Sequence, residues 1–195
     1  MKSFANIVIT GKIITEPKVL VEYGLETIYE ATVSYKRTSG KEDKFIINYS
    51  SGLSEMMNTD VVGKICNIRG ELRTTKYENI TKIYIKVREV EFLDVEPEVY
   101  ENNVRIQGIL VREPRRRKSF ADNETDIADL TIKVERGQSK ASYIPVIAWN
   151  NNARLTSKLN IDDVVNVNGR LQGHITSHGY LMTEVTTTVF DNIEE

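Results

Sequence analysis

Asn6-Ile7-Val8-Ile9-Thr10-Gly11-Lys12-Ile13-Ile14-Thr15-Glu16-Pro17 is repeated in the second half of the chain as Asn103-Val104-Arg105-Ile106-Gln107-Gly108-Ile109-Leu110-Val111-Arg112-Glu113-Pro114. Asn, Gly, Glu and Pro hold the same relative positions in both copies. A repeat whose period is close to half of the 195 residues indicates duplication of a whole domain, not a solenoid of short units. Each unit of roughly 100 residues is long enough to bury a core of its own.

The residues around the first copy predict a series of strands. Apolar and polar residues alternate with a period of two, as in half-buried strands. The glycine at position 11 suits a strongly coiled strand in which backbones approach closely. We predict strands at residues 6–15, 29–37, 44–50, 62–72 and 83–90, a loop or short extension at 19–24, and a short helix within 51–60.

The second half repeats this order of elements. Residues 130–136 match 31–37, and Gly169 falls on Gly70. The matching elements of the second half are a third strand containing Ile144, Val146 and Ala148, a short helix containing Leu155 and Leu159, and a last strand at 181–189. The two copies differ in length only by small loop insertions.

The boundaries between the units follow from an acidic segment without periodicity. Residues 94–102 contain Asp94, Glu96, Glu98 and Glu101 together with Pro97. We therefore predict a first domain at 1–93, an acidic linker at 94–102 and a second domain at 103–195. The length of the linker permits either independent domains or domains packed side by side.

The element order predicts an all-β protein made of two tandem five-stranded OB-fold barrels, each with a short helix between strands 3 and 4. An SH3-like barrel or an open sandwich would share several of these strands. The interposed helix favours the OB-fold, whose barrel binds oligonucleotides or oligosaccharides on one face and its bordering loops.

Composition excludes several classes of protein. A hydrophobic content of 40% and a charged content of 28% are ordinary for a globular protein and exclude disordered and collagen-like chains. No stretch has the continuous apolar character of a signal peptide or a membrane span, so we expect a cytoplasmic, nucleoid-associated protein. Cys66 is the only cysteine, which excludes an intrachain disulfide and suits a buried, inert thiol. The net charge of −2 divides equally between the halves, so any nucleic-acid site must come from local charge.

Motifs for catalysis or cofactor binding are missing from the sequence. There is no glycine-rich phosphate loop, paired-cysteine metal site or nucleophile with a base. His174 and His178 lie near a predicted hairpin turn without evident carboxylate or cysteine ligands, which argues against a metal site. We expect no enzyme activity, no metal and no cofactor.

Several short motifs, each loose alone, together span nearly the whole chain. The second unit contains Asn103 and Gly108, Glu113-Pro114, a strand ending in Arg136, Tyr143-Ile144-Pro145-Val146-Ile147-Ala148-Trp149 and Asn168-Gly169-Arg170-Leu171. The first unit contains Asn6, Gly11, Glu16-Pro17, Arg37 and Gly70-Glu71-Leu72-Arg73-Thr74-Thr75-Lys76-Tyr77. These motifs resemble those of the bacterial single-stranded DNA-binding proteins and their primosomal relatives.

The resemblance implies a groove that binds single-stranded DNA by stacking bases on aromatic side chains. Family members place these aromatics in the third strand and in the hairpin after the fourth. Tyr143 and Trp149 hold the third-strand positions in the second unit, and Tyr77 holds the hairpin position in the first. The counterparts, Lys44, Ser50 and a position near Thr176, are not aromatic. Each unit therefore keeps only part of the aromatic set.

The residues themselves suggest how the groove would work. Tyr143 and Trp149 are six residues apart in an extended strand, so both lie on the face opposite Ile144, Val146 and Ala148. Base stacking is one role for them, and a dimer or interdomain contact is the alternative, because tryptophan and tyrosine also dominate protein interfaces.

Positive charge concentrates in one segment of the second unit. Arg112, Arg115, Arg116, Arg117 and Lys118 fall in the predicted loop between strands one and two, which borders the binding face of an OB-fold. Phosphate contact is one reading, and a solvated run of charges is the other. Residues that could continue the cationic track are Lys36, Arg37, Arg73, Lys76, Lys133, Arg136 and Arg170.

We therefore expect a non-enzymatic protein that coats or protects single-stranded DNA in replication, repair or recombination, with the second unit as the principal contact. The alternative is an OB-fold interaction adaptor, such as a primosome or replication accessory, that has largely lost DNA binding. An enzyme is the third possibility. RNA is not excluded by any residue. Replication or repair proteins are possible partners, and the family's usual four OB units predict a homodimer of this chain.

Overall fold

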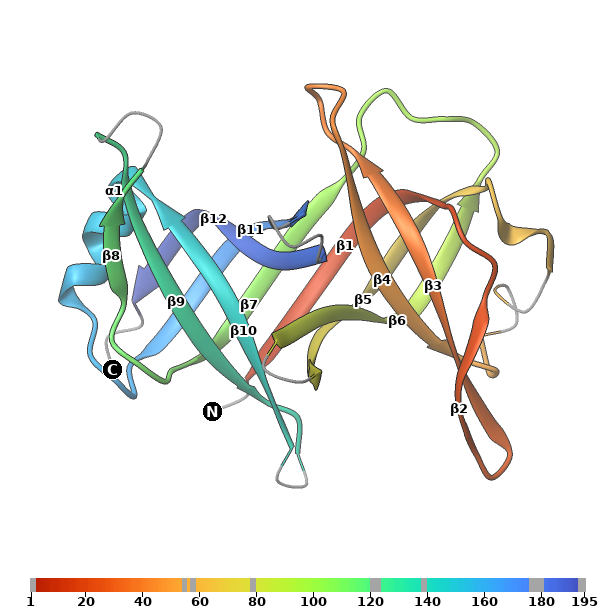
Figure 1. The fold of residues 1–195 in the computed structure, drawn as a ribbon, viewed down its shortest axis with the longest axis horizontal. Coiled ribbons are helices and arrows are strands. Elements are labelled where there is room, and N and C mark those ends of the chain that lie inside the picture. Colours follow the sequence, from red (N-terminus) through yellow and green to blue (C-terminus); the bar gives the residue numbers. More distant parts are fainter. Residues whose placement is uncertain are drawn as a thin grey trace.

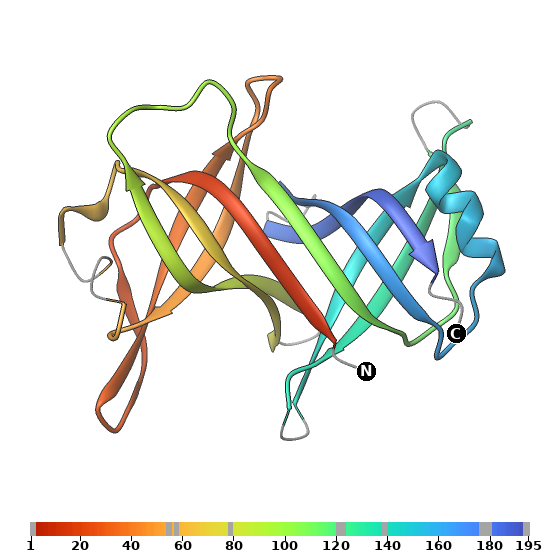
Figure 2. The same cartoon turned by 180° about the vertical axis from the view of Figure 1, so that it is seen from behind.

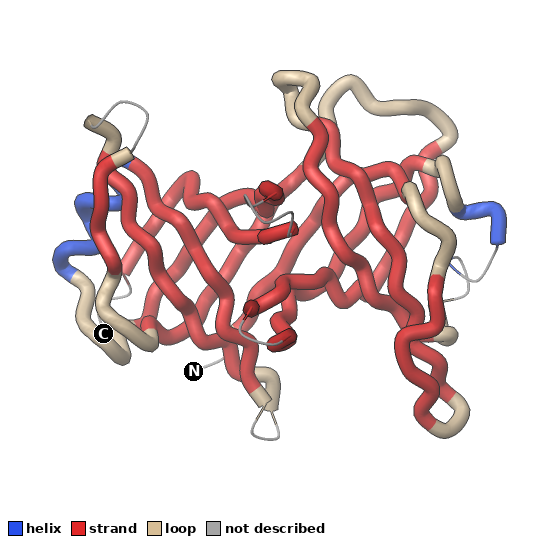
Figure 3. Tube along the Cα trace, viewed as in Figure 1, coloured by secondary structure: helices blue, strands red, loops and turns tan. Residues whose placement is uncertain are grey.

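The computed structural model describes residues 3–53, 56, 59–77, 80–119, 124–137, 140–175 and 181–192. Figure 1 shows two barrels of strands side by side, and Figure 3 shows helical turns only at the two outer ends of the molecule. The strands of the first half are β1 (Phe4–Ile13), β2 (Lys18–Tyr23), β3 (Glu26–Lys36), β4 (Glu42–Ser50), β5 (Ile65–Tyr77) and β6 (Ile80–Leu93).

The second half repeats the pattern strand for strand. Its strands are β7 (Asn102–Leu110), β8 (Arg115–Lys118), β9 (Asp126–Glu135), β10 (Ala141–Trp149), β11 (Val164–Ile175) and β12 (Leu181–Asn192). None of the helices among the described residues has the length and apolar character needed to cross a membrane.

Each half closes into a barrel of five strands. In the first half the order is β3-β4-β6-β5-β1, and β1 pairs again with β3 to complete the circle. In the second half β7-β11-β12-β10-β9 closes in the same way through pairing of β7 with β9. Two pairings are parallel, β4 with β6 and β10 with β12, and the others are antiparallel. The predicted all-β fold of two tandem five-stranded OB-fold barrels is confirmed.

Two strands lie outside the five-stranded circles and correct the sequence interpretation. β2 pairs with β3 in a hairpin, although residues 19–24 were expected to be a loop or short extension. β8 pairs with β9, so Arg115 to Lys118 form a strand and not the predicted loop. Both segments lie beside a barrel strand whose edge would otherwise be open, and pairing satisfies their backbone groups.

Helical turns lie between the third and fourth barrel strands of each half. In the second half α1 (Asn150–Leu155) is followed by the 3₁₀ helix η3 (Thr156–Lys158), as expected. In the first half the described residues form the 3₁₀ helix η2 (Thr59–Val61), and residues 54–55 and 57–58 of the expected helix lie outside the described part.

The two halves join through the first strand of each barrel. β1 and β7 pair antiparallel from Phe4 opposite Gln107 to Ile9 opposite Asn102, and Figure 2 shows them side by side. The segment before β7 is also tied to β1, because Thr10 N donates to Glu101 O at 2.8 Å. Of the two arrangements that the sequence left open, the structure has the side-by-side one.

The repeated glycines lie where strands cross at close range. A Cβ at Gly108 would lie 2.5 Å from the carbonyl oxygen of Lys133, and one at Gly70 would lie 2.5 Å from that of Lys86. A Cβ at Gly169 would collide with the carbonyl oxygen of Thr186. Glycine is required there because the facing atoms belong to the backbone and cannot rotate away.

Candidate nucleic-acid interface

The outer face of β10 presents both aromatic residues singled out from the sequence. The side chains of Tyr143 and Trp149 are 45% and 37% exposed, whereas Ile144, Val146 and Ala148 between them are buried in the barrel. The alternation of β10 therefore directs the aromatic pair outward, as the sequence predicts. In Figure 1, β9 and β10 lie at the front of the molecule, as do β3 and β4.

The ring of Trp149 is held at the junction of the barrel and α1. Its indole Nε1 donates to Thr186 Oγ1 at 3.0 Å, and the residue occupies the cap position before Asn150. Across the sheet, Trp149 pairs with Ile127, which is only 3% exposed although it lies on the outer face. The indole is thus oriented from two sides while part of its surface stays open.

Arginines lie on the same outer face as these aromatics. Residues directly opposite each other in a sheet share a face. One row across the strands runs Arg117, Ile127 and Trp149, and the next runs Arg115, Asp129, Ile147, Thr186 and Arg170. Arginine side chains therefore border the aromatic surface on both sides, from β8 and from β11.

The remaining cations of β8 lie on the other face of the sheet. Arg116 is opposite Ala128, whose side chain is buried in the barrel, and Lys118 is opposite Asp126. Lys118 Nζ lies 2.5 Å from Asp126 Oδ1, and Arg154 donates to the same carboxylate at 2.6 Å. These two hydrogen bonds hold the pKa of Asp126 below its ordinary value.

Several predicted phosphate ligands are engaged in ion pairs. Arg117 makes two hydrogen bonds to Asp129, at 3.0 and 3.2 Å, and the bond to Asp129 raises the pKa of its guanidinium. Lys133 Nζ lies 2.8 Å from Glu135 Oε1. By contrast, no described residue forms an ion pair with Arg112, Arg115 or Arg170.

On β4 of the first barrel, the positions that correspond to Tyr143 and Trp149 are not aromatic. Lys44 and Ser50 hold the outward positions on β4, and Tyr49 is buried and stacks on Tyr29 with ring centroids 5.6 Å apart. Burial raises the pKa of Tyr49 to about 12.

The predicted cations of the first barrel at the end of β3 are also paired. Arg37 makes two 2.7 Å hydrogen bonds to the buried carboxylate of Asp43, and Lys36 lies 3.5 Å from Glu96. Arg37 is therefore anchored against its own barrel.

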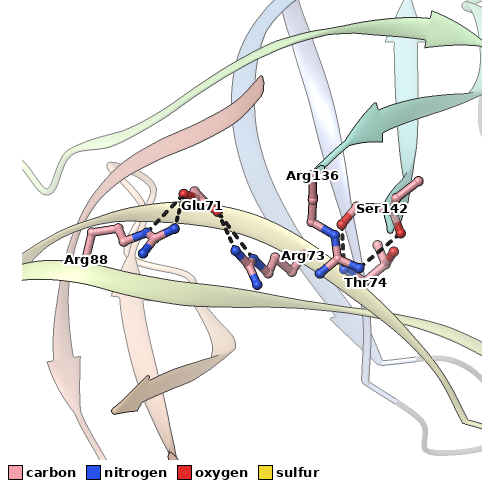
Figure 4. Close-up of polar contacts among 7 residues, drawn as sticks. Glu71, Arg73, Thr74, Arg88, Arg136 and Ser142 are labelled. Atoms are coloured by element: carbon pink, nitrogen blue, oxygen red, sulfur yellow. Dashed lines mark hydrogen bonds and ion pairs between the residues drawn. The ribbon is translucent and has the colours of Figure 1, made fainter. Parts of the chain in front are cut away.

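The hairpin β5–β6 of the first barrel reaches the aromatic face of the second. Tyr143 N donates to Thr74 Oγ1 at 3.0 Å, and Thr74 N donates to Ser142 Oγ at 3.4 Å. Figure 4 shows Thr74 beside Ser142 and Arg136. Lys76 is exposed two residues beyond Thr74, and the backbone of Tyr77 ends β5, while the side chain of Tyr77 lies outside the described part. The structure thus brings the hairpin of one unit to the third strand of the other.

A charged cluster supports the base of this hairpin. Figure 4 shows Glu71 between Arg73 and Arg88, with shortest hydrogen bonds of 2.9 and 2.6 Å. Burial alone would raise the pKa of Glu71, but the hydrogen bonds from both arginines hold it below its ordinary value. Arg136 donates to Ala141 O at 3.1 Å. These side chains line an open cleft of about 820 Å³ between the halves.

Metal binding has no support in the described part of the chain, where no three histidine, cysteine or acidic residues gather. The side chain of His174 and the whole of His178 lie outside that part. Cys66 is buried, and burial raises the pKa of its thiol to about 12.

Three residues of this surface were not foreseen from the sequence. Thr74, Ile127 and Thr186 position the aromatics, but each is separated from them by many residues. Strand pairing brings Ile127 and Thr186 to the aromatics, and the packing of the β5–β6 hairpin against β10 brings Thr74. The alternation of inward and outward residues along each strand was the only sequence signal for these three residues. It predicts the face on which a residue lies but not the strand that lies beside it.

The barrels, the aromatic face and the bordering arginines define a tandem OB-fold protein with one aromatic surface. No protein-family profile and no curated protein matches the sequence. Among solved structures, the wild-type single-stranded DNA binding protein from Thermus aquaticus is similar, with a TM-score of 0.78, 18% identity, and coverage of 100% of this chain and 95% of that one. A deletion mutant of the same protein is also similar, with a TM-score of 0.79, 18% identity, and coverage of 100% of this chain and 96% of that one.

The N-terminal domain of the PriB protein from Thermoanaerobacter tencongensis aligns with 46% of this chain and 97% of its own, at 24% identity and a TM-score of 0.41. The Thermus similarity extends over both barrels, so this chain has the fold of that protein along its whole length.

Proposed function

We propose that this protein is a non-enzymatic single-stranded DNA-binding protein that coats or protects DNA strands in replication, repair or recombination. The observation that carries the proposal is the outer face of β10, where Tyr143 and Trp149 lie exposed on either side of the row that runs from Arg115 through Ile147 to Arg170. Stacked bases contribute about 1–3 kcal/mol each on such aromatics, whatever their identity, and arginines bind the phosphates between them.

The two incomplete aromatic sets would act as one. Of the positions where the single-stranded DNA-binding family places aromatics, the first unit keeps only the hairpin position and the second keeps only the two third-strand positions. The hydrogen bonds between Thr74 and the Ser142–Tyr143 segment bring that hairpin to that strand. In this proposal Tyr77, Tyr143 and Trp149 serve a single DNA path that crosses from one barrel to the other.

Titration with oligo(dT) tests the proposal directly, because Trp149 is the only tryptophan in the chain. We expect its fluorescence to be quenched at micromolar protein and the affinity to fall steeply with salt as phosphate contacts are lost. The DNA-binding function would be rejected if neither quenching nor salt-sensitive binding occurred.

Substitution of Tyr77 tests the shared path. Tyr77→Ala changes the first barrel, whereas Trp149 reports on the second. One path predicts that this variant weakens the binding that Trp149 reports by about 5- to 150-fold, the equivalent of one stacked base. Two independent sites predict an unchanged Trp149 titration.

A second candidate function is a protein-interaction adaptor in the primosome or replication machinery. The ion pairs of Arg37, Arg73, Arg117, Lys118 and Lys133 favour it, since they leave fewer cations for phosphates. Capture of one dominant protein partner after nuclease treatment, unaffected by Tyr143→Ala or Trp149→Ala, would support the adaptor.

RNA would fit the same stacking surface, and competition between matched DNA and RNA strands measures the preference. We further propose a cytoplasmic, nucleoid-associated homodimer that presents four OB units and recruits replication or repair proteins.

A further inference from the structure

The two edge strands of the sheet differ sharply in their side chains. β2 and β8 are the terminal strands in the strand order, and each pairs on one side only, with β3 and β9 respectively. β8 consists of Arg115, Arg116, Arg117 and Lys118. β2 instead contains Val19, Leu20 and Val21 at its centre, which are 56%, 51% and 46% exposed.

An open edge is a template for pairing with another strand. Natural proteins block such edges with charged side chains, above all basic ones, and β8 follows this rule. At its centre β2 has apolar side chains in place of these charges, and its hairpin tip adds Tyr23 and Leu25, both largely exposed. Exposed apolar side chains on an unpaired edge mark a surface that a partner covers.

The sequence of β2 is complementary to itself when two copies run antiparallel. With Leu20 opposite Leu20 of a second copy, Val19 lies opposite Val21, and Lys18 lies opposite Glu22. The pairing then places opposite charges at both ends and apolar residues at the centre, and it does so twice because both copies contribute the same segment.

The pairing of β2 with β3 is irregular at the centre of this register. The pairing of β2 with β3 shifts between Val19 and Val21, so Leu20 has no partner on β3. In Figure 1 the β2–β3 hairpin projects from the end of the molecule away from the second barrel. A partner on β2 would therefore leave the face of Tyr143 and Trp149 open.

We propose that β2 is the surface through which a second copy of this chain binds, with the two β2 strands antiparallel and Leu20 at the centre. This inference rests on the proposed homodimer and is independent of the proposed DNA binding.

The first test compares the mass in solution of the wild-type protein with that of a variant that has a charge at the centre of β2. We expect the wild-type protein to have twice the 22.3 kDa mass of one chain at micromolar concentration, and Leu20→Lys to have the mass of one chain. Val95→Lys changes an even more exposed apolar residue away from β2 and should remain a dimer. A wild-type monomer, or a Leu20→Lys dimer, would overturn the proposal.

Oligo(dT) titration of the Leu20→Lys variant separates this surface from the DNA site. We expect unchanged quenching of Trp149 alongside the halved mass. If the variant lost DNA binding while its mass stayed the same as that of the wild type, β2 would be a nucleic-acid surface and the dimer proposal would be wrong.

Cross-linking tests the register. Residues directly opposite in an antiparallel pair have Cα atoms about 4.5–5.5 Å apart, within reach of a disulfide. We expect Leu20→Cys to form a covalent dimer under mild oxidation, whereas Arg116→Cys on the charged edge should not. Cys66 is buried and does not compete. No cross-link at position 20 would exclude this register.

Charge exchange gives an independent check of the same pairing. Lys18→Glu and Glu22→Lys should each raise the dimer dissociation constant several-fold, because each places like charges opposite one another. The double variant restores opposite charges and should recover most of the lost affinity. A double variant weaker than either single variant would contradict the antiparallel arrangement.

Discussion

Trp149 shows how a single residue can be both fixed and available. Its indole donates to Thr186, its strand neighbour Ile127 is buried beside it, and its side chain is still 37% exposed. A side chain held in this way loses little further rotamer freedom when a base stacks on it, so less of the stacking energy is spent on ordering.

Substitutions at position 149 separate stacking from the hydrogen bond. Trp149→Ala should weaken oligo(dT) binding about 5- to 150-fold because a stacking platform is lost. Trp149→Phe keeps an aromatic ring and should retain most of the affinity, and Thr186→Val, which removes only the acceptor, should cost less than Trp149→Ala. Anisotropy of a labelled oligonucleotide measures all three. If the alanine and phenylalanine variants lost the same affinity for oligo(dT), stacking on the ring of Trp149 would not contribute to binding.

Gly169 is the residue whose replacement should damage the fold most directly. A Cβ there meets the carbonyl oxygen of Thr186 on the neighbouring strand, so the backbones must separate. We expect Gly169→Ala to lower the free energy of unfolding by about 1–3 kcal/mol, as overpacking does in tight cores. Gly52→Ala is the control, because its Cβ would have ordinary contacts only. Urea denaturation compares them, and equal stability of both variants would contradict the close-approach argument.

At the scale of elements, the strand conformation of β8 places its four basic residues alternately on two faces of the sheet. Arg115 and Arg117 share the face of Trp149, while Arg116 and Lys118 lie on the opposite face. Of the first pair, Arg117 is committed to Asp129. Arg115 is therefore the β8 residue best placed to contact phosphate.

Neighbouring arginines on β8 provide a matched comparison. Arg115→Ala should weaken binding uniformly across DNA sequences and reduce the slope of log affinity against log salt by about 1, because one phosphate contact is lost. Arg116→Ala removes the same charge from the other face and should leave the slope almost unchanged. Salt titrations of both variants measure the difference, and equal slopes would show that only overall charge matters.

Glu71 provides a pH-dependent contribution at the base of the β5–β6 hairpin. Because its pKa is lowered in the folded state, its stabilising effect is complete above the ordinary glutamate value of 4.5 and is lost as pH falls through the folded value. We expect the melting-temperature difference between wild type and Glu71→Gln to shrink as pH falls below that value. Glu16→Gln, at an exposed position, should track the wild type at every pH. A constant Glu71→Gln difference would mean that the carboxylate charge contributes nothing.

The repeat and the strand alternation were sufficient to predict the barrels and the outward aspect of Tyr143 and Trp149. The edge strands were not predictable, because Arg115 to Lys118 has no periodicity and becomes a strand only by pairing with β9. The ion pair of Arg37 with Asp43 and the contact of Thr74 with Tyr143 likewise depend on which strands meet in space. Local patterns describe a strand's two faces but not the strand that lies across from it.

At the scale of the molecule, the halves are connected by backbone pairing as well as by the chain. The β1–β7 ladder, the bond from Thr10 to Glu101 and the contact of the β5–β6 hairpin with β10 all cross between them. Separating the barrels would leave these backbone groups to find new partners. The two barrels should therefore lose their structure together.

Unfolding monitored by two probes tests this expectation. Fluorescence of Trp149 reports on the second barrel only, and far-ultraviolet circular dichroism reports on both. We expect coincident transitions in urea, as a two-state unit requires. A fluorescence transition that precedes or follows the dichroism transition would show that the barrels unfold separately.

The β1–β7 ladder joins the repeated stretch to its own copy: Asn6 faces Arg105 and Val8 faces Asn103, so equivalent positions exchange places across the junction. If two identical single-barrel chains paired in this way, every substitution would appear in both barrels. In one chain the barrels are free to specialise, and one can lose its outward aromatics while the other keeps them. The difference between Lys44 and Tyr143 is a divergence that two identical chains could not have.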